Sequence, residues 1–294
     1  MDIDKIISDR TASTGSNADH LLQYLCEIQH QYSYIPTQAI NYLAEKLSLT
    51  EAFIQGVTGF YSFLHTTPRG HYDIKLSDNI TDHMLGSREL LSMLCQKLEL
   101  SPGVPREDGH VTVDTTSCTG MCDQAPALLV NGRVITSLDE SRINKIVELI
   151  ESEITVDSWP AEFFQVRDNI HRRDILLSTA VEPGEALKVL QKKGEESLLE
   201  LIELSGLRGR GGAGFSTGMK WRFCKQANAP QRYVVCNADE GEPGTFKDRV
   251  LLNAYADRVF EGMTLCAGII GASKGFLYLH GEYRYLRPAL EQVL

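Results

Sequence analysis

The sequence lacks several features that would each point to a class of protein. It has no run of eighteen apolar residues, the length that a membrane-spanning helix needs, so no such helix is expected. Its opening segment, MDIDKIISDR, has no apolar signal core, so a cytoplasmic protein is predicted rather than a secreted one. Basic residues number 29 against 39 acidic ones, and the net charge of -10 argues against nucleic-acid binding.

The cysteine pattern does not fit a disulfide framework. The 294 residues contain seven cysteines, an odd number, which indicates thiols or metal ligands in a chain without a signal peptide. Five cysteines lie in apolar stretches and are expected to be buried thiols: Cys26, Cys95, Cys224, Cys236 and Cys266. The other two, Cys118 and Cys122, form a C-x3-C pair, which alone is weak evidence for zinc.

The periodicity of the first half predicts two folded parts. Apolar residues recur at helical spacing over 18–30 and 37–47, and a third helix starts near Thr50, so residues 1–65 are expected to form a helical bundle. Residues 66–152 read as a small α/β domain. Its expected strands are 71–76, 111–114, 127–130 and 134–135, and its helices are 87–98, capped by Ser87, and 138–150. The Asn131-Gly132 pair predicts a hairpin between the last two strands.

The second half is expected to be a separate α/β domain. Residues 153–180 are polar and poorly periodic and are interpreted as a linker or arm. Residues 181–294 alternate between helices and strands, which predicts a β-α-β arrangement. The expected helices are 195–204, 254–270 and 285–294, and the expected strands are 232–236 and 275–280. The sequence stops inside the last of these helices, which we interpret as truncation; the alternative is a natural end that frays.

The most informative segment is the run GLRGRGGAGFSTGMK at residues 206–220. Six of its fifteen residues are glycine, and two arginines and a lysine add positive charge. Gly209, Gly211 and Gly214 have the spacing of the dinucleotide fingerprint, but a predicted helix precedes them, which disfavours an ordinary Rossmann turn. Because glycine lacks Cβ, such a loop can bring backbone N–H groups against a phosphate. The alternative interpretation is a flexible surface loop.

A second unusual segment, CNADEGEPGTFKDR, occupies residues 236–249, and its turn at residues 237–242 offers one amide and three carboxylates. Together with residues 205–223, it resembles the FMN- and NADH-binding subunit of respiratory complex I. NAD-reducing hydrogenases and NAD-linked formate dehydrogenases share this module. The resemblance covers about residues 165–294 and departs at Ser216, where proline is usual. It implies a Rossmann-like α/β FMN-binding domain in which the cofactor carries the chemistry of hydride transfer, so no catalytic side chain is expected.

The resemblance also implies which residues bind FMN and NADH. The FMN-binding residues are expected to be Gly209, Arg210, Gly211, Gly212, Lys220, Asn237, Asp239 and Glu240. Those expected to hold NADH are Phe215 and Phe223, by stacking, and Glu242, at hydroxyl groups.

The first half resembles the thioredoxin-like [2Fe–2S] subunit of complex I over residues 18–150. The similar motifs are QYSYIP at 31–36, GVTGFYSF at 56–63 and CTGMCDQAP at 118–126. Four thiolates normally hold such a cluster. In that family a first cysteine pair, C-x4-C, precedes the C-x3-C pair. Its two positions fall on Ser77 and Asp82 in this sequence, which leaves Cys118 and Cys122 as half a metal site.

Three interpretations of this half-site stay open. The cluster is lost and the domain is structural; or Ser77, Asp82 or His83 completes an atypical cluster; or the cysteines serve another metal or a redox disulfide. The presence of a [2Fe–2S] cluster is therefore in doubt from the sequence alone.

The order of the two domains resembles the diaphorase large subunit of bidirectional NAD-reducing [NiFe] hydrogenases. That family ends in a [4Fe–4S] domain with a C-x2-C-x2-C run, which this sequence lacks, so a [4Fe–4S] cluster is expected only in a missing C-terminal region. The implied activity is NADH:acceptor oxidation through FMN, with electrons leaving to iron–sulfur and hydrogenase subunits. The alternatives are a flavoprotein subunit of formate dehydrogenase or of complex I, another flavin or nucleotide enzyme, and a non-catalytic scaffold for the first half.

Overall fold

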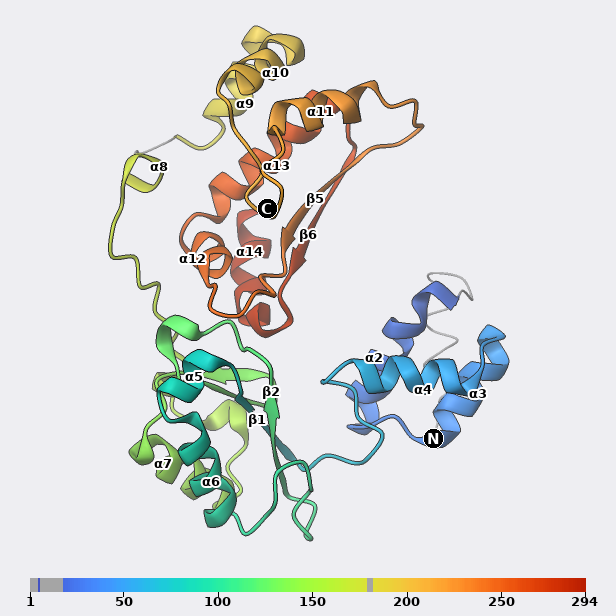
Figure 1. Cartoon of the computed structure of the whole chain (residues 1–294), viewed down its shortest axis with the longest axis vertical. Coiled ribbons are helices and arrows are strands. Elements are labelled where there is room, and N and C mark those ends of the chain that lie inside the picture. The colour runs from blue at the N-terminus through green and yellow to red at the C-terminus, as the bar shows by residue number, and fades with distance from the viewer. Residues whose placement is uncertain (1–4, 6–17, 179–181) are drawn as a thin grey trace. The chain divides into compact units, whose positions relative to one another are not determined.

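The computed structural model describes residue 5, residues 18–178 and residues 182–294 (Figure 1). Contacts between residues divide the chain into two compact units. The first comprises Met1–Thr119 and Ala125–Gln165, and the second comprises Gly120–Gln124 and Val166–Leu294. No helix in the described part of the chain is both long and apolar enough to cross a membrane.

A helical bundle opens the first unit. It contains η1 (Ala18–His20), α2 (Leu21–Tyr32), α3 (Thr37–Leu47) and α4 (Glu51–Phe60). Leu25, Leu43 and Ile54, one from each α-helix, are buried in one core. The hydroxyl of Thr50 accepts a hydrogen bond from the backbone N–H of Phe53 at 3.2 Å and caps α4. The three predicted helices are confirmed.

The rest of the first unit is built on a four-stranded sheet in the order β2-β1-β3-β4. Its strands are β1 (Tyr72–Ser77), β2 (Val111–Thr116), β3 (Leu128–Val130) and β4 (Arg133–Ile135). β1 and β2 run parallel, and the other pairs are antiparallel. Asn131 and Gly132 have φ angles of 49° and 77°, the left-handed values that a tight hairpin turn requires, so the predicted hairpin is confirmed.

Three helices complete this part: α5 (Ile80–Met84), α6 (Ser87–Lys97) and α7 (Glu140–Glu151). α6 and α7 pack on the sheet through a single core that includes Leu94, Ile146 and Ile74. The prediction that Ser87 caps α6 is wrong. Gly86 holds the cap position with a φ of 87°, because the turn from α5 into α6 needs a left-handed residue, and Ser87 is the first buried residue of the helix.

The segment after α7 is more tightly packed than its polar composition suggests. It forms η3 (Val156–Ser158) and η4 (Ala161–Phe164). Trp159 and Phe163 are buried in the core of the sheet domain, and the Trp159 indole N–H donates to the carbonyl of Ile154 at 2.7 Å. Two aromatic anchors therefore attach this segment to the first unit.

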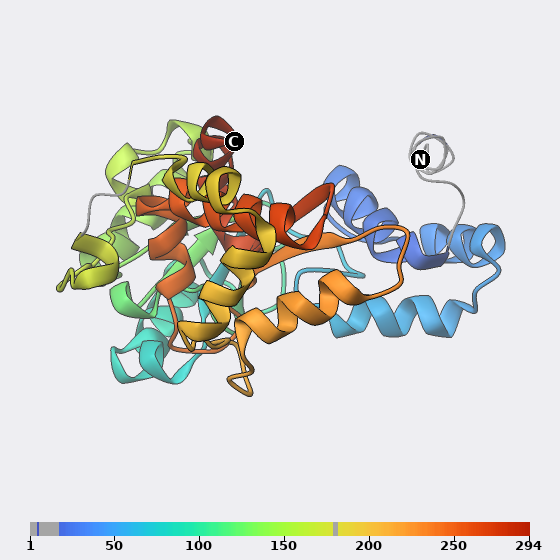
Figure 2. The same ribbon diagram turned by 90° about the horizontal axis from the view of Figure 1, so that it is seen from above.

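The second unit is built around two parallel strands, β5 (Tyr233–Ala238) and β6 (Lys274–Leu279). Its helical elements are α8 (Ile175–Ser178), α9 (Glu185–Lys193), α10 (Glu195–Leu204), α11 (Thr217–Gln226), α12 (Lys247–Ala254), α13 (Ala256–Ile270), η5 (Gly281–Leu286) and α14 (Arg287–Val293). α13 contacts both strands and lies beside them in both ribbon views (Figures 1 and 2). The predicted parallel β-α-β arrangement is confirmed, with two helices, α12 and α13, between the strands.

One face of the β5–β6 pair is open. Val235 on β5 and Phe276 on β6 are paired in register, and both are more than half exposed, as is Tyr278. The opposite face carries the buried Val234, which packs on α13. Parallel strands are usually covered on both faces, so this open apolar face is unusual.

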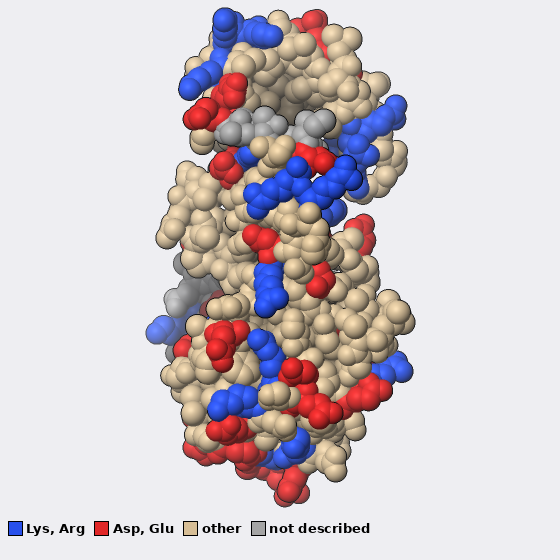
Figure 3. All heavy atoms as spheres, turned by 90° about the vertical axis from the view of Figure 1, so that its left-hand side faces the viewer, with Lys and Arg blue, Asp and Glu red and all other residues tan. Residues whose placement is uncertain are grey.

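On the face shown in Figure 3, basic and acidic side chains are interspersed.

Candidate functional site

The glycine-rich segment forms a closed loop between two helices of the second unit. Gly206, with a φ of 67°, follows the end of α10, and its N–H donates to the carbonyl of Glu203 at 3.1 Å. Arg208 and Ser216 then pair as an isolated antiparallel bridge, and the N–H of Gly209 donates to the carbonyl of Phe215 at 2.9 Å. The predicted helix before the loop is present, so the loop is not a strand-to-helix Rossmann turn.

The backbone of this loop has room for a ligand. A Cβ placed on Gly211, Gly212 or Gly214 would meet nothing within 4 Å, and the φ angles of Gly212 and Gly214 are 155° and 65°. Arg208 donates through Nη1 to the carbonyl of Gly214 at 3.1 Å, and this hydrogen bond links the two sides of the loop. Open glycine backbone of this kind lets N–H groups approach a phosphate closely, so this loop could hold the phosphate of a cofactor.

The helix after the loop presents the predicted lysine and aromatic residues. The hydroxyl of Ser216 caps α11 by accepting from the N–H of Met219 at 3.4 Å, and its φ of -59° is a value that proline also takes. Lys220 is exposed one turn into α11 and shares a helix face with Phe223. The rings of Phe215 and Phe223 lie 6.3 Å apart and are each about half exposed, so they are available for stacking.

The second motif begins where β5 ends. Asn237 is the penultimate residue of the strand, and its side-chain carbonyl accepts from the N–H of Asp239 at 3.0 Å, which shapes the turn. Asp239 is half-buried and Glu242 is exposed. The carboxyl ends of parallel strands are the usual place for ligands in open α/β sheets, so these side chains lie where a cofactor is expected.

Glu240 differs from the other predicted cofactor residues because it is buried. Only 7% of the residue is exposed, and its backbone has the left-handed φ of 47°. Its carboxylate accepts hydrogen bonds from the N–H groups of Asp248 at 2.9 Å and of Arg249 at 3.1 Å. These groups begin α12, so Glu240 acts as a cap for that helix.

One helix supports both motifs. α13 contacts α10 and α11, which flank the glycine loop, and it also contacts β5, which leads into the second motif. The shared core includes Leu199 on α10, Val234 on β5 and Ile269 on α13. The glycine loop and the acidic turn therefore belong to one packed scaffold.

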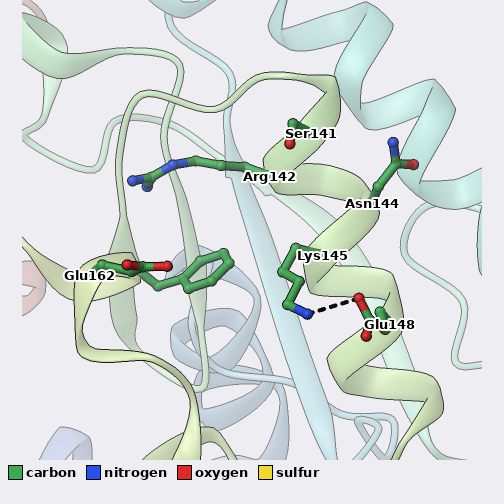
Figure 4. Close-up of a pocket in the computed structure, with 7 residues that line it drawn as sticks. Ser141, Arg142, Asn144, Lys145, Glu148 and Glu162 are labelled. Carbon is green, nitrogen blue, oxygen red and sulfur yellow. Dashed lines mark hydrogen bonds and ion pairs between the residues drawn. The ribbon is translucent and has the colours of Figure 1, made fainter.

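A surface pocket in the first unit lies beside α7 and η4 (Figure 4). Lys145 and Glu148, 2.9 Å apart, form an ion pair at its edge, and Arg142 is committed to the carbonyl of Thr136. The residues that line it are Ser141, Arg142, Asn144, Lys145, Glu148, Glu162 and Phe163. This pocket contains none of the predicted cofactor residues.

The positions of the first cysteine pair hold a buried polar cluster in the sheet domain. Asp82, 1% exposed, accepts from the Ser77 hydroxyl at 2.8 Å and from the N–H of Ala127 at 2.9 Å. The Asn79 amide donates to the same carboxylate and, at 3.5 Å, to the sulfur of Cys118. Burial raises the pKa of Asp82, and its hydrogen bonds oppose this shift.

These residues do not fit a [2Fe–2S] cluster held by four thiolates. The Asp82 carboxylate is committed to three protein donors. Over residues 18–178 and 182–294, no group of three His, Cys, Asp or Glu side chains gathers as a metal site would require. Cys118 and Cys122 as metal ligands remain a prediction from the sequence.

Two family models match separate parts of the chain. Residues 3–151 match the family of thioredoxin-like [2Fe-2S] ferredoxins, and residues 202–294 match the Nuo51 FMN-binding domain. Subunit alpha of the NAD-reducing hydrogenase HoxS of Cupriavidus necator is 35% identical over 95% of this chain and 48% of its own length. A subunit of the NADH-quinone oxidoreductase of Rhizobium meliloti is 46% identical over 40% of this chain and 29% of its own length.

Two solved structures are similar to nearly the whole of this chain. A chain of the NAD+-reducing [NiFe]-hydrogenase in the air-oxidized state matches with a TM-score of 0.83 and 41% identity, over 93% of this chain and 48% of that one. The H2-reduced state matches with a TM-score of 0.84 and 40% identity, over 95% and 48% of the two chains. The present chain thus spans about half the length of these hydrogenase relatives. It belongs to the thioredoxin-like [2Fe–2S] ferredoxin family and, with the FMN-binding domain that follows, has the architecture found in the alpha subunit of an NAD-reducing hydrogenase.

Proposed function

We propose that this chain is the FMN- and NADH-binding module of a cytoplasmic NADH:acceptor oxidoreductase, a diaphorase. The observation that carries the proposal is the closed glycine loop, which has open backbone at Gly211 and Gly212 and leads through Phe215 into α11, the helix of Lys220 and Phe223. Bound FMN would supply the chemistry, because a flavin takes up a hydride and gives up electrons one at a time.

The residues of the chain would bind and orient the two cofactors. The loop N–H groups and the Lys220 ammonium would hold the FMN phosphate, since charge-assisted hydrogen bonds to phosphate are strong. Asn237 and Asp239 offer polar groups at the end of β5 for the flavin. Phe215 and Phe223 would stack on NADH, and the exposed Glu242 would accept from its hydroxyl groups.

The electrons would pass to iron–sulfur centres in partner subunits. The relatives are subunits of an NAD-reducing hydrogenase and of NADH-quinone oxidoreductases, so the partner is a hydrogenase or another redox complex of this kind.

FMN binding by the whole chain tests this proposal. We expect the purified protein to be yellow, or to quench added FMN fluorescence with a stoichiometry of one, and Lys220→Ala to weaken binding by about tenfold, the effect of losing one charged contact. Lys225→Ala is the matched control, because Lys225 lies on the same helix and pairs with Glu195 at 2.8 Å. A reconstituted protein that stays colourless would contradict the proposal.

For residues 66–152, we propose a structural role without an iron–sulfur cluster. The buried hydrogen bonds of Asp82 support this role, because they use the carboxylate that an atypical cluster would need. Iron and acid-labile sulfide in the anaerobically reconstituted protein should then stay at background. Stoichiometric iron and sulfide, with a charge-transfer absorption band, would show that the domain holds a cluster.

A further inference from the structure

The segment Gly120–Gln124 belongs to the same compact unit as the flavin motifs. Gln124 exchanges two hydrogen bonds with the backbone of Arg167, at 2.8 and 2.9 Å. The Asp123 side chain is 5% exposed and lies 2.6 Å from Nη2 of Arg249. Asn169 also donates to the Asp123 carboxylate, at 2.9 Å. These hydrogen bonds and the buried ion pair hold Gly120–Gln124 in the second unit.

Arg249 connects this segment to the acidic turn. Its side chain is 1% exposed, and Nη1 donates to the carbonyl of Arg167 at 2.9 Å. Its backbone N–H donates to Oε2 of Glu240 at 3.1 Å. A buried guanidinium needs a charged partner, so Asp123 fixes the side chain while Glu240 fixes the backbone of the same residue.

The Glu240 carboxylate is saturated by protein donors. Its side chain is fully buried. Oε1 accepts from the N–H of Asp248 at 2.9 Å and from Nζ of Lys247 at 3.4 Å. Oε2 accepts from the N–H of Arg249 and, at 3.0 Å, from the hydroxyl of Tyr283. With two donors on each oxygen, Glu240 holds the acidic turn in place rather than reaching toward a ligand.

Tyr283 closes the network. It is completely buried, and its hydroxyl lies 3.2 Å from the carbonyl oxygen of Gly120 as well as 3.0 Å from Glu240. A Cβ on Gly120 would fall 2.3 Å from the Tyr283 oxygen, and the φ of Gly120 is 70°. Gly120 therefore admits the tyrosine ring only because it is glycine. Burial and the neighbouring Glu240 raise the pKa of Tyr283, so its hydroxyl stays a donor.

These contacts form a ring: Gly120 and Asp123 on one segment, Arg249 in the first turn of α12, Glu240 on the acidic turn after β5, and Tyr283 on η5. The left-handed backbone of Glu240 is unfavourable for that residue, and such conformations persist where surrounding contacts impose them. Asn237 and Asp239 immediately precede Glu240, so the ring sets the backbone that presents them.

We propose that Asp123 and Tyr283 are positioning residues of the flavin site, acting through Arg249 and Glu240 on the turn that carries Asn237 and Asp239. This inference rests on the proposed function. It gives residues 120–123, which overlap the C-x3-C pair, a role that needs no metal: they support the turn that carries Asn237 and Asp239.

The test compares conservative variants of the whole chain. Tyr283→Phe deletes one oxygen, and Asp123→Asn removes the charge at constant size. We expect each variant to raise the Kd for FMN by about tenfold, or about 1.4 kcal/mol, and to shift the midpoint potential of the bound flavin. Asp123→Glu, which keeps the charge, should recover part of the affinity. The controls are Glu291→Gln, at an exposed pair with Arg287, and Tyr233→Phe, an exposed tyrosine.

The possible outcomes separate the two proposals. If the unaltered chain binds FMN and both variants bind it equally well at an unchanged potential, the positioning role is overturned while the proposed function stands. If the unaltered chain binds no FMN, the proposed function is wrong, and this inference, which rests on it, is wrong as well. Circular dichroism identifies a variant that does not fold. If Asp123→Asn does not fold, the Kd and midpoint potential of Tyr283→Phe test the inference, because this variant keeps the ring that fills the core.

Discussion

The buried carboxylate of Asp82 accepts hydrogen bonds from three separate groups of the sheet domain. It holds Ser77, Asn79 and the N–H of Ala127. Asp82→Ala would leave these three buried donors without an acceptor, so we expect the free energy of unfolding to fall by about 3 kcal/mol in urea titrations. Asp157→Ala is the control, since that side chain is 96% exposed and should change stability by less than about 0.5 kcal/mol. Equal effects of the two variants would contradict this role.

His65 makes the first unit sensitive to acid. Burial, with the nearby cations Lys75 and Arg69, lowers its pKa to about 4, against the opposing effect of Asp73 and Asp114. The folded-state pKa lies below the ordinary value of 6.5, so the stability that His65 contributes is present above pH 6.5 and is lost as the pH falls toward 4.

Replacement of His65 should therefore flatten the acid side of the stability profile. We expect His65→Gln to lose about 2 kcal/mol less stability than the unaltered chain between pH 6.5 and 4, measured by urea unfolding at each pH. This figure is below that of the full pKa difference, because solvent partly screens the half-buried ring. The exposed His171 serves as the control position. Parallel profiles for His65→Gln and the unaltered chain would rule out this assignment.

At the scale of elements, the packing of α10 against α11 depends on one glycine. A Cβ on Gly218 would lie 2.5 Å from Cγ of Glu203 and 2.8 Å from its backbone nitrogen. Gly218→Ala should therefore cost about 2 kcal/mol in thermal unfolding, since backbone atoms cannot yield easily. Gly59→Ala on α4 is the matched change: it meets open space and should stabilise its helix by up to about 1 kcal/mol. A neutral Gly218→Ala would contradict the close packing.

The elements that the sequence predicts are those with a strong local signal. The apolar spacing of α2, α3 and α7, the Asn131-Gly132 turn and the helix before the glycine loop are all present. α5, α9, α11 and α12 are not among the predicted helices, because they lie in polar or motif-rich stretches, and α5 has only five residues. The cap of α6 cannot be predicted in the same way, because it depends on the turn from α5, which the sequence around Ser87 does not reveal.

Much of the candidate site can be predicted from the sequence, because its glycines, lysine and aromatics are contiguous. The burial of Glu240 cannot be predicted this way. Its partner Tyr283 lies 43 residues away, and Asp123 lies 126 residues from Arg249. Contacts between such distant residues exist only once the chain has folded, and no local pattern records them.

At the scale of the whole molecule, the two units have separate cores. Leu94, Ile146 and Trp159 belong to a core in the first unit, and Leu199, Val234 and Ile269 belong to that of the second. A ligand stabilises only the part whose folding creates its site. At a hundredfold excess over its Kd, FMN should add about 2.7 kcal/mol to the second unit.

Hydrogen exchange can test this division. Amides of β5 and α13 should exchange more slowly with FMN present, while those of β1 and α7 keep their rates. Slowing of β1 and α7 to the same extent would show that the two units unfold as one.

The open face of β5 and β6 has a consequence for colloidal behaviour. In the described part of the chain these strands form a two-stranded sheet, so each has one edge of backbone groups without a neighbouring strand. Beside those edges lie the exposed Val235, Phe276 and Tyr278. The free backbone N–H and C=O groups of each edge can pair with a strand of another chain, so each edge is a site at which chains can associate. The strand edges and the exposed side chains beside them thus form a surface on which a strand of another chain can pair.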